Sequence, residues 1–123
     1  MTWAVWHHKL KPDFVETICG EPSRKHDVGK TRFELVDPYA LEQLARVLTY
    51  GARKYSAGEW RGLENWAERY HGALMRHLIA WQGGEQMDPE SGLPHLSHVL
   101  CNAHFLVALD RESKSPTRVA EVP

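Results

Sequence analysis

The stretch YHGALMRHLIAWQGGEQMDPESGLPHLSHVLCNAHFL, residues 70–106, decides the fold of this chain. Its first part repeats apolar residues at helical spacing, and the pair Gly83-Gly84 then ends that pattern. A turn rich in acidic residues follows, and a second helical pattern begins near Pro94. The stretch therefore predicts two helices joined by a short connection.

Three segments of the chain show the apolar spacing of a helix. The first opens at Asp37-Pro38, because aspartate caps a helix start and proline is tolerated at the first helical position. The second covers about residues 63–81 and the third about residues 94–110. The apolar faces that we expect to pack are Leu41, Leu44, Ala45, Leu48, Ala52 and Tyr55 in the first segment, and Leu96, Val99, Leu100, Ala103, Leu106 and Val107 in the third. Three helices with short connections predict an all-α helical bundle.

The length of 123 residues predicts a single domain. We divide it into an irregular N-terminal arm (1–36), a helical core (37–110) and a polar tail (111–123), with a short strand expected at residues 2–6. A helical core of this size buries little apolar surface by itself. We therefore expect it to be completed by oligomerisation, as a homodimer or homotetramer.

The composition argues against some classes of partner. Hydrophobic residues make up 42% of the chain, charged residues make up 25%, and the net charge is −1. A charge this small provides no general attraction to duplex nucleic acid or to an anionic membrane, and no segment approaches the ~20 apolar residues of a membrane span. The two cysteines, Cys19 and Cys101, lie too far apart for a zinc or redox motif. We expect a cytoplasmic protein with free thiols.

One polar residue lies on the apolar stripe of the second helix. His77 falls near the centre of that stripe, so we expect its side chain to point inward. His95 and His98 lie one turn apart at the start of the third helix, on a strip that also holds Asn102. Each histidine alone is typical of a helix core or surface. An inward histidine that faces a pair on the next helix is, however, how helical bundles build metal sites.

The turn between these two helices carries the carboxylates Glu85, Asp88 and Glu90. Imidazole and carboxylate ligands together suit Mn²⁺, Fe²⁺, Co²⁺ or Zn²⁺ better than Mg²⁺. In a purely structural interpretation, Asp88 caps a helical turn and Glu90 stabilises its positive end. The two interpretations are compatible, because a turn that is rigid enough to cap a helix also positions a ligand.

Basic and aromatic side chains are available for an anionic substrate. A nearly neutral protein that binds a polyphosphate needs a local set of cations, although solvent-exposed charge and core aromatics are the ordinary roles of such residues. The candidates for phosphate binding are Lys30, Arg32, Lys54 and Arg76, and those for stacking on a base are Tyr55 and Trp60.

Two runs of the sequence together resemble a known family. They are DVGKTRFELVDPYALEQLARVLTYGARKYSAGEWRG, residues 27–62, and the opening stretch. Over about residues 27–109 the chain resembles the phage-rich family of dATP/dGTP diphosphohydrolases, a divergent branch of the MazG-like all-α nucleoside triphosphate pyrophosphohydrolases. The resemblance implies a MazG-like bundle that hydrolyses dGTP or dATP to the monophosphate and pyrophosphate with a divalent metal. It further implies a location in the host cytoplasm and a supply of dGMP for 2-aminoadenine synthesis.

The chain departs from the MazG-like metal pattern, in which an E-x-x-E helix faces an E-x-x-D helix. His95-Leu-Ser-His98 stands where E-x-x-D is expected. His77 falls near the second glutamate of the other pair, and Leu74 occupies the position of the first. The resemblance thus implies Mn²⁺ or Mg²⁺, with Co²⁺ as a third choice, held by a different set of ligands.

The resemblance and the available side chains suggest the following roles. The expected metal ligands are His77, Glu85, Asp88, His95 and His98. The expected catalytic carboxylates are Glu85, Asp88 and Glu90, with Glu90 as the base. Lys30, Arg32, Lys54 and Arg76 are expected to neutralise phosphate charge, and Asn102 to orient a ligand or the nucleotide.

Two other interpretations stay open at this point. Because the MazG-type carboxylate pairs are missing, the chain is also consistent with a non-catalytic helical module that binds a nucleotide or a protein. The same histidines are consistent with a structural zinc site, in which case a chelator unfolds the protein.

Overall fold

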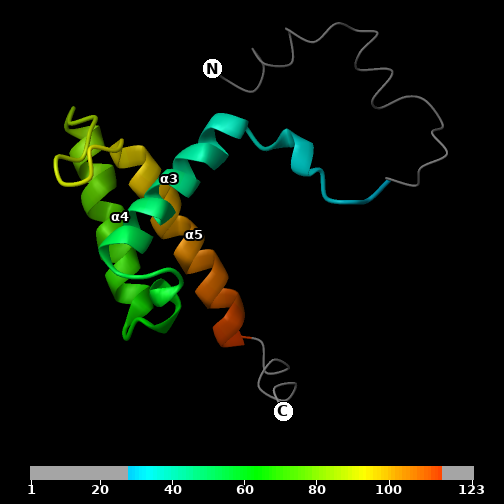
Figure 1. Ribbon diagram of the computed structural model, residues 1–123. Helices are drawn as coiled ribbons and strands as arrows, with labels where there is room; N and C mark the ends of the chain where they lie inside the picture. The colour runs from blue at the N-terminus through cyan, green and yellow to red at the C-terminus, as the bar shows by residue number, and fades with distance from the viewer. Residues whose placement is uncertain (1–27, 115–123) are drawn as a thin grey trace, which may run out of the picture. The chain divides into compact units, whose positions relative to one another are not determined.

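The computed structural model describes residues 28–114, and these residues form an all-α fold (Figure 1). The elements are η1 (Phe33–Leu35), α3 (Pro38–Lys54), η2 (Glu59–Gly62), α4 (Trp66–Gln82) and α5 (His95–Lys114), of which η1 and η2 are 3₁₀ turns. The predicted all-α class is confirmed. Between residues 28 and 114 there is no strand, and the only β-type contact is an isolated bridge from Met87 to Pro94.

The chain divides after Phe33 into two units, and the second unit contains all three helices. The strand expected at residues 2–6 and the thiol of Cys19 lie outside the described residues. None of the helices within residues 28–114 has the length and the apolar character needed to cross a membrane.

Helix α3 starts where the sequence predicts. The Asp37 carboxylate accepts a hydrogen bond of 2.9 Å from the backbone N–H of Ala40, which caps the first turn ahead of Pro38. The buried face of α3 differs from the prediction, because Gln43 and Val47 are its buried residues. The predicted packing of Leu41 and Tyr55 is wrong, since both are exposed.

Helix α4 begins three residues later than the predicted start at about residue 63. The preceding segment forms η2, and Asn65 adopts a left-handed conformation with φ of 54° directly before the helix. The predicted stop at Gly83-Gly84 is confirmed. The N–H of Gly83 donates to the carbonyl of Ile79, and Gly84 then turns the chain with φ of 100°.

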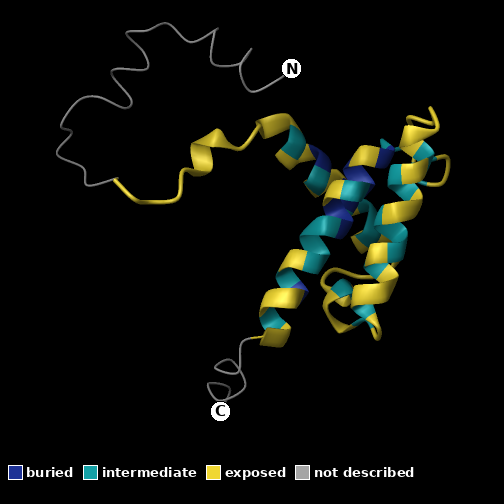
Figure 2. Ribbon diagram, turned by 180° about the vertical axis from the view of Figure 1, so that it is seen from behind, coloured by how far each residue is buried: buried dark blue, intermediate teal, exposed yellow. Residues whose placement is uncertain are grey.

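Helix α5 extends to Lys114, past the predicted end near residue 110. It packs against α4, α3 and η2, and the buried positions gather where it meets α3 (Figure 2). The prediction that Leu96, Leu100 and Val107 are buried is wrong, because all three are exposed. The buried residues of α5 are His95, Ser97, His98, Cys101, Asn102 and Leu109. Four of these six residues are polar, whereas the large apolar side chains of Leu96, Leu100 and Val107 are exposed.

Candidate functional site

The connection between α4 and α5 folds back on itself and brings a carboxylate next to α5. The N–H of Asp88 donates to the carbonyl of Leu93 over 2.9 Å, and the N–H of His95 donates to the carbonyl of Gln86 over the same distance. These two bonds close the connection into a tight loop. Asp88 is thereby held beside the first turn of α5.

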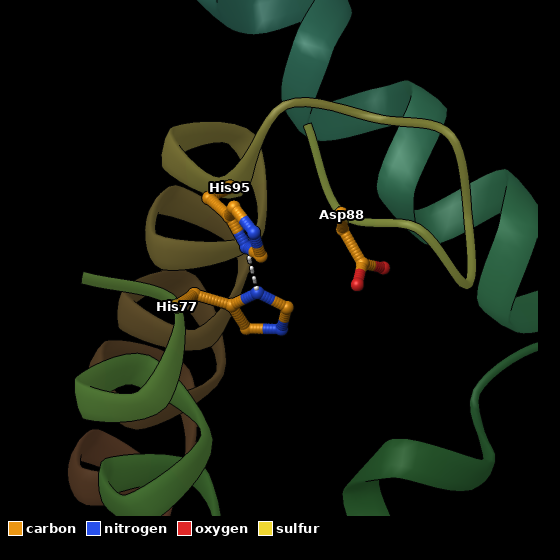
Figure 3. A group of neighbouring side chains, drawn as sticks. All are labelled: His77, Asp88 and His95. Atoms are coloured by element: carbon orange, nitrogen blue, oxygen red, sulfur yellow. Dashed lines mark hydrogen bonds between the residues drawn. The ribbon is translucent and has the colours of Figure 1, made fainter. Parts of the chain in front are cut away.

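His77 of α4 and His95 of α5 point toward each other (Figure 3), as the position of His77 on the apolar stripe predicts. Their Nδ1 atoms lie 2.8 Å apart. The other ring nitrogen of His95, Nε2, lies 2.9 Å from Oε1 of Glu85. Because a carboxylate can only accept a hydrogen bond, Nε2 carries the proton of a neutral His95 ring. Nδ1 of His95 then offers a lone pair toward His77.

The residues at this point fit a divalent metal ion. His77, Asp88 and His95 each offer one ligand atom, and these atoms lie within 4.8 Å of one another. Two ligand atoms at about 2.1 Å from one ion, and at right angles around it, lie about 3 Å apart, which the histidine contact approaches. A carboxylate behind a ligating imidazole, as Glu85 stands behind His95, is the usual second partner of such a ligand.

His98 lies one turn along α5 from His95 and is 8% exposed. Its ring stacks on that of His77, with the centroids 4.4 Å apart and an angle of 7° between the planes. Nε2 of His98 lies 2.6 Å from Oγ of Ser91 and 3.4 Å from Oδ2 of Asp88. The hydroxyl of Ser91 in turn lies 2.7 Å from the same Asp88 oxygen.

The protonation states favour metal binding at neutral pH. Burial lowers the pKa of both His77 and His98, and the nearby His98 ring contributes to the lowering for His77. Burial acts to raise the pKa of Asp88, but hydrogen bonds from Ser91 outweigh it and hold this pKa below its usual value. These shifts favour neutral imidazoles at His77 and His98 and an ionised carboxylate at Asp88, which are the forms of these groups that bind a metal.

Glu90 lies outside this three-residue cluster and pairs with α3 instead. The Lys54 ammonium donates a hydrogen bond to the Glu90 carboxylate, and the Tyr50 hydroxyl lies 3.5 Å from the same oxygen. The bond from Lys54 holds the pKa of Glu90 below its usual value, and Glu90 in turn raises the pKa of Lys54. Glu90 is therefore kept ionised.

A cleft of about 1250 Å³ lies beside the histidines, bounded by α3, η2, α4 and α5. A volume of this size is sufficient for a ligand as large as a nucleotide. Its lining includes His77, Asp88 and His98, and also the cations Lys54, Arg69 and Arg76. The carboxylates of Glu59, Glu68 and Glu90 line it as well, so the cleft offers cationic groups and two of the candidate metal ligands, His77 and Asp88, without carrying a net positive charge.

Aromatic rings line another part of the cleft. Trp60, Tyr70 and Phe105 form a cluster in which the Phe105 centroid lies 4.8 Å from that of Trp60 and 4.6 Å from that of Tyr70. The guanidinium of Arg61 lies over the Trp60 ring at 4.4 Å. A base that stacked on Trp60 would have to displace one of these neighbours.

The structure places the other predicted site residues as follows. Tyr55 and Asn102 line the cleft, but the Asn102 amide donates to the carbonyl of His98 over 2.8 Å. Glu85 contacts His95 and is not a member of the three-residue cluster. Lys30 and Arg32 belong to the unit that precedes Glu34, so their roles stay predictions.

Sequence reasoning missed two residues of the site. Ser91 lies three residues after Asp88. At this spacing an aspartate side chain commonly accepts a hydrogen bond from the backbone N–H of the later residue, as the Asp88 carboxylate does from Ser91. Tyr50 lies one helical turn before Lys54, so both side chains lie on the same face of α3. The two spacings were visible in the sequence, but their partners come together only after the connection folds back.

These features define a helical protein with a histidine–carboxylate centre beside a cleft lined by charged and aromatic side chains, and comparison with known proteins identifies its family. The family described as dATP/dGTP diphosphohydrolase, N-terminal, matches residues 20–117. A dATP/dGTP diphosphohydrolase of Salmonella phage PMBT28 is 37% identical over 82 residues, which are 67% of this chain and 28% of the relative. No solved structure matches the chain. The chain belongs to the dATP/dGTP diphosphohydrolase N-terminal family, and it spans little more than a quarter of the relative's length.

Proposed function

We propose that this chain hydrolyses purine deoxynucleoside triphosphates, dGTP and dATP, to the monophosphate and pyrophosphate with a divalent metal. The observation that carries the proposal is the convergence of His77, Asp88 and His95 within 4.8 Å, next to a cleft of nucleotide size. Membership of the family supports it, as does the name of the phage relative.

The proposed metal ligands are two imidazoles and one carboxylate, and not carboxylates alone. His77, Asp88 and His95 would hold the ion, with Mn²⁺ favoured over Mg²⁺ because two of the three donors are imidazoles. A divalent ion in this position neutralises phosphate charge and acidifies a water molecule. Co²⁺ suits the same donors.

The side chains of the cleft would act on the phosphates and on the attacking water. Lys54 and Arg76 bind the negative oxygens of the triphosphate. When Lys54 turns to a phosphate, Glu90 loses the partner that lowers its pKa and becomes a better base. Glu90 then takes a proton from the water that attacks the α-phosphorus. The bond from that phosphorus to the bridging oxygen breaks, and pyrophosphate leaves.

The test is an assay of pyrophosphate release from dGTP, dATP, dCTP and dTTP with Mn²⁺, Mg²⁺ or Co²⁺. We expect turnover of the purine nucleotides and its loss in His77→Ala. The matched control is His71→Ala, because His71 lies on the same helix but is exposed and outside the cleft. Nucleotide binding without turnover under any metal would favour a non-catalytic module. Unfolding by a chelator would favour a structural zinc site.

We also propose that the chain forms a homodimer or homotetramer. Exposed apolar residues lie on α4 (Met75 and Ile79) and on α5 (Leu96, Leu100 and Val107, the last 73% exposed). Such side chains at helical spacing suit a helix interface. We expect light scattering to give a multiple of 14.1 kDa for the chain, and a smaller mass for Ile79→Glu.

In a phage, the dGMP released from dGTP would supply the synthesis of 2-aminoadenine nucleotides in the host cytoplasm. Growth of the phage with an inactive variant, compared by the 2-aminoadenine content of its DNA, tests this role. An unchanged content would contradict it without bearing on the hydrolysis itself.

A further inference from the structure

The Ser91 hydroxyl makes three contacts at the junction of the loop and α5. Its oxygen lies 2.7 Å from Oδ2 of Asp88 and 2.6 Å from Nε2 of His98. The backbone N–H of Leu93 donates to the same oxygen over 3.2 Å. Ser91 is half-buried and Asp88 is half-buried, while His98 is buried, so these contacts are shielded from much of the solvent.

Counting protons fixes the direction of each bond. A hydroxyl has one proton to donate and two lone pairs that accept. Asp88 is ionised and can only accept, so the single hydroxyl proton points to Asp88. The two lone pairs of Ser91 Oγ then receive the N–H of Leu93 and a second donor. That donor is Nε2–H of His98.

We propose that Ser91 is a positioning residue that holds His98 in the tautomer protonated at Nε2, so that Nδ1 is the His98 atom available to a ligand in the cleft. The same arrangement recurs one turn earlier on α5. There the Nε2–H of His95 is bonded to Glu85 and its Nδ1 faces His77. In both His95 and His98, a neighbouring side chain therefore accepts a hydrogen bond from Nε2–H, and the lone pair of Nδ1 is left for another partner.

The use of this atom rests on the proposed function, whereas the tautomer itself does not. In that function, Nδ1 of His98 would bind a metal or receive a hydrogen bond from a phosphate-bound water. The ring stacked on His77 would keep the same plane throughout. A metal-binding histidine usually donates its outer N–H to a carboxylate, a carbonyl or a water, and at His98 the Ser91 hydroxyl stands between the ring and the Asp88 carboxylate.

The experiment is a long-range ¹H–¹⁵N correlation spectrum of the full metal-free chain with ¹⁵N-labelled histidine. The signals of His98 are assigned by their absence in His98→Gln. We expect a protonated, pyrrole-type nitrogen at Nε2 and an unprotonated, pyridine-type nitrogen at Nδ1. The reverse pattern in the wild type would show that Ser91 donates to His98 and would overturn the proposal. This result would leave hydrolysis untouched, so the two proposals fail separately.

Variants of Ser91 test whether this residue sets the tautomer. In Ser91→Ala we expect the two His98 nitrogens to move toward an averaged position, and Ser91→Thr, which keeps a hydroxyl, to restore the wild-type pattern. Unchanged His98 signals in Ser91→Ala would overturn the positioning role. If Ser91→Ala fails to fold, the wild-type and Ser91→Thr spectra still decide the tautomer.

A matched control separates positioning from general loss of a buried hydroxyl. Ser97 is a buried serine of α5 whose hydroxyl donates to Gln43 over 2.8 Å, away from the relay. Ser97→Ala should leave the His98 pattern unchanged. In turnover, we expect Ser91→Ala to lower kcat about 10- to 100-fold and Ser91→Thr to recover most of it. An equal fall in Ser97→Ala would indicate a merely structural effect.

Discussion

Nε2 of His95 lies 2.9 Å from Oε1 of Glu85, so a histidine that is only 4% exposed is tied to a carboxylate at the surface. The second ring nitrogen faces His77 at 2.8 Å. Glu85 therefore controls which nitrogen of His95 carries a proton, and through it the atom that is left for a metal. This arrangement separates the residues that would touch the ion from those that orient them.

The first prediction concerns Glu85. Glu85→Gln removes the charge behind His95 and leaves a side chain of the same size, so we expect about 10- to 100-fold weaker Mn²⁺ binding with an unchanged fold. Isothermal titration with Mn²⁺, together with a circular dichroism melt, measures both quantities. Glu42→Gln is the matched control, since Glu42 forms an exposed pair with Arg46 on α3. Equal affinities of Glu85→Gln and the wild type would show that Glu85 does not orient the ligand.

The second prediction concerns Lys54 in the cleft. Lys54→Met removes a cation that lines the cleft and bonds to Glu90, and we expect the KM for dGTP to rise about 10- to 150-fold, since a charge-assisted hydrogen bond contributes about 1.5–3 kcal/mol. Initial rates over a range of dGTP concentrations give KM and kcat separately. Arg46→Met on the same helix removes a cation whose partner is exposed Glu42 and should leave KM unchanged. A KM unaffected by Lys54→Met would exclude phosphate binding by this residue.

The sequence predicted where the helices begin and end better than it predicted which helix faces pack together. The Asp37 cap and the Gly83-Gly84 stop are local signals, and the structure keeps both. The predicted buried face of α5 is wrong, because counting apolar residues assigns Leu96 and Leu100 to the core although both are exposed. In the structure, the face toward α3 and α4 is occupied by His95 and other polar residues of the candidate site.

The candidate site could be predicted in part for a related reason. His77 was found because a polar residue in the middle of an apolar stripe stands out. Ser91 was not found, because its partners Asp88 and His98 come together only through the tertiary fold of the loop. The pairing of Glu90 with Lys54 spans 36 positions and has no local signal at all.

The third prediction concerns Cys101, which is buried in α5. Burial raises the pKa of its thiol from 9.0 to about 12, so the folded protein keeps the thiol protonated at pH 8. In a Cys19→Ser, Ser113→Cys background, we expect iodoacetamide to modify the exposed position 113 quickly and Cys101 only after unfolding. Mass mapping of the modified peptides reports both rates.

The same shift makes stability depend on pH at the alkaline end. Between pH 9 and pH 12 the unfolded chain loses the Cys101 proton while the folded chain retains it, so unfolding becomes easier as the pH rises. Denaturant melts at pH 8 and pH 10 should show this loss, and it should be smaller in Cys101→Ala. A similar loss in both proteins would assign the effect to other groups.

The fourth prediction concerns His104, whose Nδ1 is buried and has no hydrogen-bond partner within residues 28–114. Burial lowers its pKa, and the nearby Arg61 lowers it further. Below pH 6.5 the unfolded chain therefore takes up a proton that folded His104 resists. Its contribution to stability is present above pH 6.5 and is lost as the pH falls through the folded pKa.

His104→Phe replaces this ring with one that cannot be protonated and that suits its neighbours Trp60 and Phe105. We expect the free energy of unfolding to fall less between pH 7 and pH 5 in this variant than in the wild type, as measured by urea melts at each pH. The quantity compared is the change in the free energy of unfolding between pH 7 and pH 5. A change in packing that alters this free energy equally at both pH values does not affect the comparison. His77 and His98 remain in both proteins and contribute the same acid sensitivity to each. The exposed histidine gives the control, because His71→Phe should keep the wild-type slope. If His104→Phe also kept it, the unpartnered nitrogen would have no part in the acid response.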